Sequence, residues 1–378
     1  MLLLKTLFRI RNKQMVIHKP ILFYILLLVI FGCLNVYAQT SSGFRVVGYY
    51  CGTTIPVDSF ETNKLTHLIF CFGGLNGNRF SIHSAKDSAT IKQMVELKSK
   101  NSTLKIMLSL GGWGGCKTCS DVFNSDKGRK EFATSVKQLS DYFKTDGIDL
   151  DWEYPAIKGV PGHTYRVEDR TNFTSLLKEL RTTNGKQFEI SFAAGGFTTY
   201  IDSSIEWKEV IKYTDFINIM SYDLVHGYSV ISGHHTPLYS TSQQKESTDN
   251  AVQMLLKAGV PANKLVIGAA FYGRYFKIEE GSKVDLYMPC KFSHGFSSKY
   301  SSDSLSVENG FEKHWDDVAK APYAINTKRR LLATYDNEQS IALKTKYAVK
   351  NKLGGIMFWQ LYDDKFHDGL LETINKNK

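Results

Sequence analysis

Four acidic side chains stand within eight residues of this 378-residue sequence, at Asp146, Asp149, Asp151 and Glu153. The last three alternate with apolar residues, and in an extended strand side chains two positions apart share one face. We therefore expect these three carboxylates to point the same way. Carboxylates held this close repel one another, which raises the pKa of at least one of them. The pattern suits an enzyme that needs a carboxylic acid still protonated near neutral pH.

An acidic edge strand and a calcium-binding loop are the alternative explanations of this segment. An EF-hand loop needs Asp-x-Asp-x-Asp-Gly and a glutamate at its twelfth position. Here Gly147 precedes the last three acids, and Leu150 and Trp152 stand where a calcium loop has small polar residues. Three histidines elsewhere also follow no zinc spacing, so we expect no metal site. We interpret them as loop and cleft residues: His226, His234 and His235.

The acidic segment resembles the Asp-x-x-Asp-x-Asp-x-Glu signature of glycoside hydrolase family 18, the chitinase family, and all four acidic positions match. The resemblance implies a retaining hydrolase of β-1,4 bonds between N-acetylglucosamine units, with chitin or chito-oligosaccharides as partners and no cofactor. It also implies that the acetamido oxygen of the substrate acts as the nucleophile, an exception to the usual scheme of two carboxylates.

The resemblance assigns catalytic roles to four residues. Glu153 is expected to be the general acid and then the general base. Asp151 is expected to accept the acetamido N–H and to offset the positive charge of the oxazolinium ion. Asp149 is implied as the inner partner of Asp151, and Tyr222 as the hydroxyl donor to the acetamido oxygen.

Other positions that match the family are expected to bind sugar or to support the carboxylates. Tyr49 and Ser109 are implied as hydrogen-bond donors to Asp149. Trp359 is implied as the apolar floor beneath the sugar next to the cleaved bond. Further residues expected at the substrate site are Trp113, Met220, Asp223 and Arg274.

Short apolar segments alternate with helical patterns along the chain, which predicts parallel βα units and an α/β fold, the TIM (β/α)8 barrel. The catalytic barrel is expected over residues 39–378. A small α+β insertion is expected at about 275–336, because the connection between the seventh and eighth strands is too long for one crossover helix. The candidate residues follow the carboxyl ends of strands, where barrel active sites lie. The expected strands are 44–50, 65–72, 105–110, 147–152, 188–194, 216–222, 265–272 and 354–360.

The first 38 residues are typical of an export signal. Five basic residues precede or flank an apolar run over 21–34 that is too short for an ordinary transmembrane helix, and Ala38 ends a small-x-small cleavage site. Lipidation of Cys33 in a lipoprotein box, which Phe31 fits poorly, and an uncleaved anchor are the alternatives. We expect a secreted, periplasmic or cell-surface monomer, without a stable membrane span once the signal is removed.

The charge of the chain gives no sign of a nucleic-acid partner. Without residues 1–38 the chain has 42 basic and 37 acidic residues, and no basic run indicates nucleic acid as a partner.

Five cysteines remain without residues 1–38, so at least one is unpaired within a monomer. Cys116 and Cys119 have neither a second cysteine pair nor a thioredoxin-like context, which leaves a local disulfide or two inert thiols.

Two other functions remain open beside that of a chitinase. One is an endo-β-N-acetylglucosaminidase that cuts the chitobiose core of N-glycans, and the other is a non-catalytic chitin-binding lectin. The presence of Glu153 counts against the lectin, because lectins of this family typically lose the acid. We expect no separate carbohydrate-binding domain, since Lys378 closely follows the last expected helix.

Overall fold

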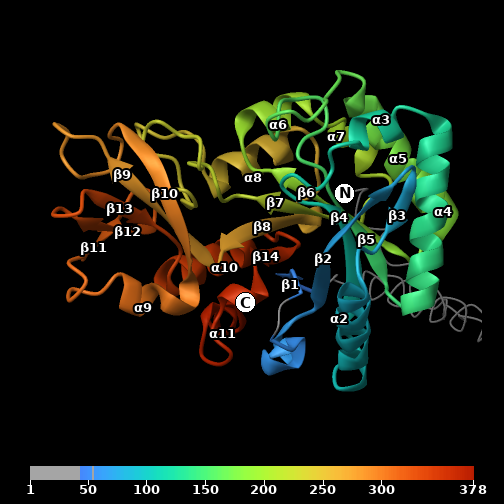
Figure 1. Cartoon of the computed structure of the whole chain (residues 1–378), viewed down its shortest axis with the longest axis horizontal. Coiled ribbons are helices and arrows are strands. Elements are labelled where there is room, and N and C mark those ends of the chain that lie inside the picture. The colour runs from blue at the N-terminus through green and yellow to red at the C-terminus, as the bar shows by residue number, and fades with distance from the viewer. Residues whose placement is uncertain (1–42, 53–54) are drawn as a thin grey trace, which may run out of the picture. The chain divides into compact units, whose positions relative to one another are not determined.

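Eight parallel strands pair in the order β1, β2, β4, β5, β6, β7, β8 and β14, and β14 pairs back with β1 (Figure 1). The sheet therefore closes into a barrel, which confirms the expected TIM-barrel fold. The barrel strands are β1 (Arg45–Tyr50), β2 (His67–Asn76), β4 (Lys105–Gly111), β5 (Gly147–Asp151), β6 (Glu189–Gly195), β7 (Phe216–Met220), β8 (Leu265–Ala270) and β14 (Gly355–Trp359).

The structure, a computed structural model, describes residues 43–52 and 55–378. The expected export signal over residues 1–38, with its cleavage site and Cys33, lies outside these residues. Among the described residues, no helix combines the length and the apolar character needed to cross a membrane.

Helices cover the outside of the barrel, because alternate side chains of each strand point outward and are apolar, whereas the side chains between them face the barrel interior. Ile148 and Leu150 of β5 are fully or almost fully buried in the large outer core between strands and helices. A short strand, β3 (Arg79–Ser81), pairs antiparallel with β2. The helices around the barrel are α2 (Ala85–Glu96), α3 (Cys119–Phe123), α4 (Asp126–Phe143), α5 (Asp169–Asn184), α6 (Thr198–Ser203), α7 (Trp207–Val210), α8 (Thr248–Lys257), α10 (Glu338–Lys350) and α11 (Leu370–Asn377).

Local side-chain bonds fix where two of the longer helices begin. The Ser125 hydroxyl accepts a hydrogen bond from the backbone N–H of Gly128 and so caps α4. At α10, Asn337 and Ser340 each bind the other's backbone N–H, which forms a reciprocal capping box. These caps satisfy amide groups that would otherwise lack partners in the first helical turn.

The barrel interior holds a second, smaller core. Aliphatic and aromatic side chains from six of the strands fill it, together with Tyr222 from the loop after β7. This packing surrounds the inward-facing carboxylates of β5 with apolar groups. Members of this interior core include Val47, Tyr49, Ile69, Met107, Phe216, Val266 and Met357.

A five-stranded antiparallel sheet stands between β8 and α10, where the sequence analysis expects an insertion at about 275–336. Figure 1 shows this lobe in orange and red beside β8. Its strand order is β10, β9, β13, β12, β11, with the short helix α9 (Ser301–Ser304) in one connection. The lobe strands are β9 (Tyr272–Ile278), β10 (Cys290–Ser297), β11 (Glu312–Asp316), β12 (Ala321–Asn326) and β13 (Leu331–Thr334).

The expected seventh strand, 265–272, is wrong at its end. β8 stops at Ala270, and the lobe strand β9 begins at Tyr272. Phe271 marks the break, since its ring stacks on Phe358 at 4.1 Å between centroids and its N–H donates to the carbonyl of Trp359. The continuous apolar run through this point gives no sign of the change from barrel to lobe.

A buried ion pair joins the barrel to the end of the lobe. The Lys344 ammonium lies 2.6 Å from Asp336 Oδ2, and both side chains are fully buried. Lys344 also donates to Thr236 Oγ1 at 2.6 Å. Asp336 accepts from the N–H of Ala270 at 3.0 Å and from Ser340 Oγ at 2.6 Å. One carboxylate therefore connects the end of β8, the loop after β7 and the start of α10.

Lys344→Met should destabilise the protein strongly, because it leaves the Asp336 carboxylate buried without its counter-charge. We expect a loss of about 3–5 kcal/mol in the free energy of unfolding. Urea denaturation measures it. The matched control is Lys346→Met, an exposed position on the same helix, which should change the free energy by no more than about 0.5 kcal/mol. Equal effects of the two substitutions would show that the buried pair contributes nothing special.

Candidate active site

The acidic segment lies at the carboxyl end of β5, on the rim of the barrel. β5 stops at Asp151, so Trp152 and Glu153 stand in the following loop rather than in the strand as expected. The expected alternation nevertheless holds in one respect, because Trp152 packs outward against Phe123 and Phe173. The strand therefore positions two carboxylates by regular geometry, and the loop positions the third.

Asp149 accepts hydrogen bonds from four side chains on four different strands. Tyr49 and Ser109 donate to Oδ2 at 3.1 and 2.9 Å. Ser191 and Asn218 donate to Oδ1 at 2.6 and 3.2 Å. Asn218 also donates to the Tyr49 hydroxyl at 2.9 Å. Burial raises the pKa of Asp149, although these four hydrogen bonds act in the opposite direction. Every lone pair of this carboxylate is thus occupied inside the protein.

Asp151 is buried but poorly satisfied. Its side chain is 4% exposed, and its Oδ1 atom has no hydrogen-bond partner within the described residues. Burial raises the pKa of Asp151 well above its usual value, and the charges of Glu153 and Asp149 raise it further. A buried acceptor without a donor is costly to the protein alone. It is therefore placed to receive a donor from a bound molecule.

Glu153 is partly buried and lies between two other acidic groups. Burial raises the pKa of Glu153 to about 7, a hydrogen bond with Tyr154 lowers it, and the charge of Asp223 raises it. The charge of Glu153 in turn raises the pKa of its neighbour Asp151, because each ionised carboxylate disfavours ionisation of the other. The carboxyl is thus a group that can donate a proton near pH 7 and take one back later.

Tyr222 follows β7, which ends at Met220, two residues before the end of the expected strand. There the Ser221 side chain takes the place of backbone hydrogen bonds between β7 and β8, because its hydroxyl donates to the carbonyl of Gly268 and accepts from the N–H of the same residue. Among the residues that the structure describes, the Tyr222 hydroxyl reaches only the sulfur of Met357, at 3.7 Å. Sulfur is a weak acceptor, so the hydroxyl remains free to donate a stronger hydrogen bond.

Asp223 and Arg274 form a bidentate ion pair across the rim. Arg274 Nε and Nη2 lie 2.6 and 2.5 Å from the two oxygens of Asp223, and the Tyr272 hydroxyl donates to Asp223 Oδ1 at 2.7 Å. Arg274 and His235 hold the pKa of Asp223 well below its usual range despite burial. Arg274 is expected at the end of a barrel strand but lies in the lobe strand β9, so this ion pair links barrel and lobe.

Aromatic side chains form two groups at the same rim. Trp359 stacks on Phe72 at 5.7 Å between ring centroids, at the end of β14. Trp113 is half exposed and contacts both Tyr154 and Tyr228, each at 6.3 Å. Flat rings of this kind offer apolar surfaces to the C–H face of a sugar. The structure thus brings the expected residues Trp113 and Trp359 to the same end of the barrel as the carboxylates.

A model of the family "Glycosyl hydrolases family 18" matches residues 45–364. The chain belongs to glycosyl hydrolase family 18. The match includes the acidic segment, both aromatic groups and the lobe. Family 18 membership supports a glycoside hydrolase of the chitinase type.

Three relatives illustrate the membership. Chitinase A1 of Niallia circulans is 29% identical over 87% of this family 18 chain and 58% of its own length. Probable chitinase 2 of Drosophila melanogaster is 30% identical over 82% of this chain and 68% of its own. A solved family 18 N-acetylglucosaminidase from Paenibacillus barengoltzii is 32% identical, with a TM-score of 0.81 over 89% of this chain and 100% of that one. This chain thus spans little more than half of Chitinase A1.

Sequence reasoning missed two of the four donors to Asp149 in this family 18 protein. Ser191 lies directly opposite Asp149 in the β5–β6 register. Asn218 is the polar residue between two isoleucines of β7. A single polar residue at an inward position of an apolar strand is a usable signal, because buried polar groups need partners. Without the register, however, the sequence does not say which partner that is.

The histidines after β7 take structural partners. His234 lies 3.0 Å from Asp316 of the lobe, and fully buried His235 faces Asp223 at 3.5 Å. Burial lowers the pKa of His235, which keeps the ring neutral. Within the described residues, no group of three or more His, Cys, Asp or Glu side chains could hold a metal ion. His234 and His235 are therefore buried residues that connect the loop to the lobe and to Asp223.

Ser191→Ala should destabilise the family 18 fold, because it removes the shortest hydrogen bond to the buried Asp149 carboxylate. A hydrogen bond to a charged acceptor of this kind is worth about 1.5–3 kcal/mol in the free energy of unfolding. Chemical denaturation measures the change. Ser203→Ala, at an exposed site at the end of α6, is the control and should have almost no effect. A Ser191→Ala protein as stable as the wild type would contradict the assigned network.

Proposed function

We propose that the protein hydrolyses β-1,4 bonds between N-acetylglucosamine units of chitin or chito-oligosaccharides and retains the anomeric configuration. One observation carries this proposal. Glu153, whose pKa burial raises to about 7, stands two residues after Asp151, which has a buried oxygen without a hydrogen-bond partner in the part of the chain that the structure describes. The first group can protonate a departing glycosidic oxygen, and the second can receive the N–H of the substrate's acetamido group.

In the first step, protonated Glu153 gives its proton to the glycosidic oxygen while the bond from that oxygen to C1 breaks. The acetamido oxygen of the same sugar attacks C1 and closes an oxazolinium ring. Asp151 accepts the acetamido N–H and offsets the positive charge that develops there. Tyr222 donates its free hydroxyl to the acetamido oxygen and so orients it. Preorganised electrostatic groups of this kind are usually the largest single contribution to catalysis.

In the second step, the Glu153 carboxylate takes a proton from a water molecule, and the resulting hydroxide attacks C1 from the side that the leaving group vacated. The oxazolinium ring opens, and the acetamido group is restored. Two inversions at C1 give net retention. Glu153 is protonated again at the end, so the cycle returns to its starting state without any cofactor.

No protein carboxylate is needed as the nucleophile. In ordinary retaining glycosidases a second carboxylate attacks C1. Asp149 is unsuited to that role, because it is fully buried and its oxygens accept four hydrogen bonds. Asp151 is better suited to charge stabilisation, since its Oδ1 atom has no partner among the described residues and can accept the acetamido N–H. We propose Trp359 as the platform beneath the sugar, with Trp113 and the residues Met220, Asp223 and Arg274 as further contacts.

We also propose that the protein is exported. This rests on the sequence of residues 1–38, and the substrate polymer lies outside cells.

Release of single N-acetylglucosamine units is a second candidate reaction, favoured by the 32% identity with the N-acetylglucosaminidase of Paenibacillus barengoltzii. Chromatography of the products of chitohexaose separates the two: dimers and trimers indicate internal or dimer-releasing cleavage, whereas monomers alone indicate the second reaction.

Glu153→Gln should abolish most of the activity, because an amide of the same shape cannot donate the proton. We expect kcat for a fluorogenic chitobioside or chitotrioside to fall by about 10²–10⁴-fold. Glu308→Gln, at an exposed position of the lobe, is the control and should retain full activity. If wild type and Glu153→Gln are equally inert but both bind chitin, the protein is a lectin and the proposal fails.

The rate should fall on the alkaline side of neutrality. Glu153 must be protonated to act as the acid, and its pKa is about 7, so kcat should decrease as the pH rises through about 7. Tyr154→Phe removes the hydrogen bond that lowers this pKa, and should move the alkaline limb of the profile to higher pH. Tyr142→Phe, an exposed tyrosine of α4, is the control. An unchanged or downward shift in Tyr154→Phe would contradict this assignment.

A further inference from the structure

A buried carboxylate outside the barrel holds the loop that carries Glu153. Asp169 is the first residue of α5 and is completely buried. It accepts hydrogen bonds from the backbone N–H of Arg166 at 2.7 Å and from the N–H of Ala156. Both ends of the loop between β5 and α5 are therefore tied to one side chain. Ala156 lies only three residues after Glu153.

The backbone next to Glu153 is tightly constrained. Ala156 adopts φ +62°, a left-handed conformation that costs a non-glycine residue about 1–2 kcal/mol and persists only where its surroundings enforce it. At Gly159 a Cβ atom would lie 2.2 Å from the carbonyl oxygen of Glu153. The loop thus folds back onto the backbone of Glu153, and any displacement of the loop moves that residue.

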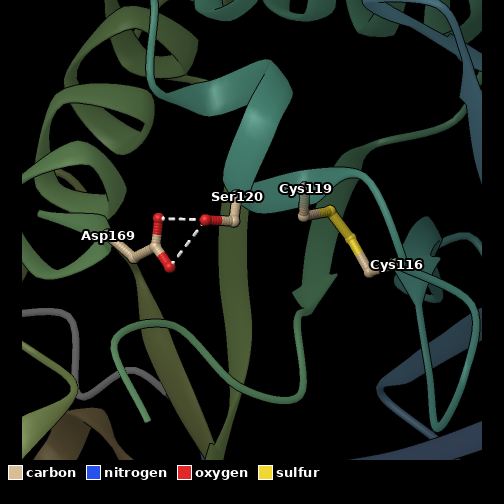
Figure 2. Close-up of a disulfide and its surroundings, with 4 residues drawn as sticks. All are labelled: Cys116, Cys119, Ser120 and Asp169. Atoms are coloured by element: carbon tan, nitrogen blue, oxygen red, sulfur yellow. Dashed lines mark hydrogen bonds between the residues drawn. A yellow bond between two sulfur atoms is a disulfide. The ribbon is translucent and has the colours of Figure 1, made fainter. Parts of the chain in front are cut away.

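The same Asp169 carboxylate reaches a second loop through Ser120. The Ser120 hydroxyl lies 2.8 and 3.0 Å from the two oxygens of Asp169 and accepts from Arg166 Nη1 at 2.7 Å. Figure 2 shows this contact beside the disulfide between Cys116 and Cys119. The disulfide closes the turn that leads into α3, and Ser120 is the next residue along the helix. The position of the Ser120 hydroxyl therefore depends on the start of this helix.

The disulfide also borders the turn that carries Trp113. Gly112 donates its N–H to the carbonyl of Asp151 at 2.8 Å. At Gly111, with φ +110°, a Cβ atom would lie 2.1 Å from that carbonyl and 3.6 Å from the Cβ atom of Cys116. The glycine turn is thus packed against the backbone of Asp151 and lies next to the disulfide.

We propose that Asp169, Ser120 and the Cys116–Cys119 disulfide form a clamp that positions Glu153 and Trp113 for catalysis. The proposal rests on the hydrolase function proposed above. The clamp holds the loop after β5 and the turn after β4, and both segments adjoin the backbone of Asp151. None of its members touches the substrate, so they are positioning residues.

The chemistry of the clamp favours a positioning role over simple packing. A carboxylate is expensive to bury, and apolar residues of similar volume are often as stabilising. Hydrogen bonds to a carboxylate are directional and fix geometry, which packing of smooth apolar surfaces does less well. General acids are sensitive to displacement, because a shift of about 1 Å can lower a rate by about 100-fold.

Asp169→Asn tests the clamp directly, since the amide keeps the size of the side chain but turns a donor toward Ser120 or toward the loop N–H groups. We expect kcat on the chitobioside to fall about 10–100-fold with a smaller change in KM. The alkaline limb of the kcat profile should also move to lower pH, because a loosened Glu153 gains contact with water. The titratable groups that face Glu153 are Asp151, Asp223, Tyr154, Tyr200 and Tyr222, and none of them is altered. Asp141→Asn, an exposed position of α4, is the control.

The disulfide is tested separately. The double substitution of Cys116 and Cys119 by serine should lower kcat in the same direction. Dithiothreitol should do the same to the wild type: it gives two electrons and two protons to the disulfide, becomes a cyclic disulfide itself, and its removal with reoxidation should restore the rate. Cys290→Ser, a buried free cysteine of the lobe, is the control. Thermal unfolding followed by circular dichroism reports whether each variant is folded.

Three outcomes are decisive. If wild type is active and folded Asp169→Asn shows the same kcat and the same alkaline limb, the clamp does not position Glu153. If Asp169→Asn fails to fold, Ser120→Ala and the cysteine variants decide by the same two readouts, and unchanged values would again overturn the proposal. If the wild type itself cleaves no chito-oligosaccharide, the proposed function fails, and the clamp proposal falls with it.

Discussion

The burial of three neighbouring carboxylates is the constraint on which the rest of the site depends. Each loses hydration, and each raises the pKa of the next. The protein treats the three differently. Within residues 43–52 and 55–378, Asp149 receives four donors, Asp151 has an oxygen without a partner, and Glu153 remains partly exposed with a pKa of about 7. The protein thus satisfies the innermost carboxylate fully and leaves Asp151 and Glu153, nearer the rim, able to interact with a bound molecule.

Only a closed barrel can supply the donors to Asp149. They come from β1, β4, β6 and β7, which are separated by up to 169 positions in the chain and meet because parallel strands converge around one axis. A slip of one residue in any of these strands would turn its donor to the outer face. The apolar side chains of the interior core exclude water as a substitute donor. Closure of the barrel therefore fixes both the register of these strands and the hydrogen bonds that surround the Asp149 carboxylate.

The sequence was sufficient for the fold and for the chemical character of the site, because strand alternation and the acidic signature are local patterns. Asp149 and Asp151 face inward as alternation predicts. What the sequence could not supply is long-range partnership. Ser191 and Asn218 are ordinary polar residues until the register places them at Asp149. The break at Phe271 is hidden in an apolar run, and Asp169 is one acidic residue among many at a helix start.

The barrel strands position some of the catalytic residues, and the loops after the strands position the others. Asp149 and Asp151 are set by β5, but Glu153 and Tyr222 each stand two residues beyond their strands, where the backbone ladder no longer holds them. Side-chain contacts outside the barrel take over there: Asp223 is bound to Arg274 of the lobe on one side, and Asp169 holds the loop on the other. A general acid must change protonation state and therefore needs some exposure to solvent. A loop provides that exposure, but its backbone then needs to be held by other contacts. The Asp223–Arg274 ion pair and the buried Asp169 carboxylate supply such contacts.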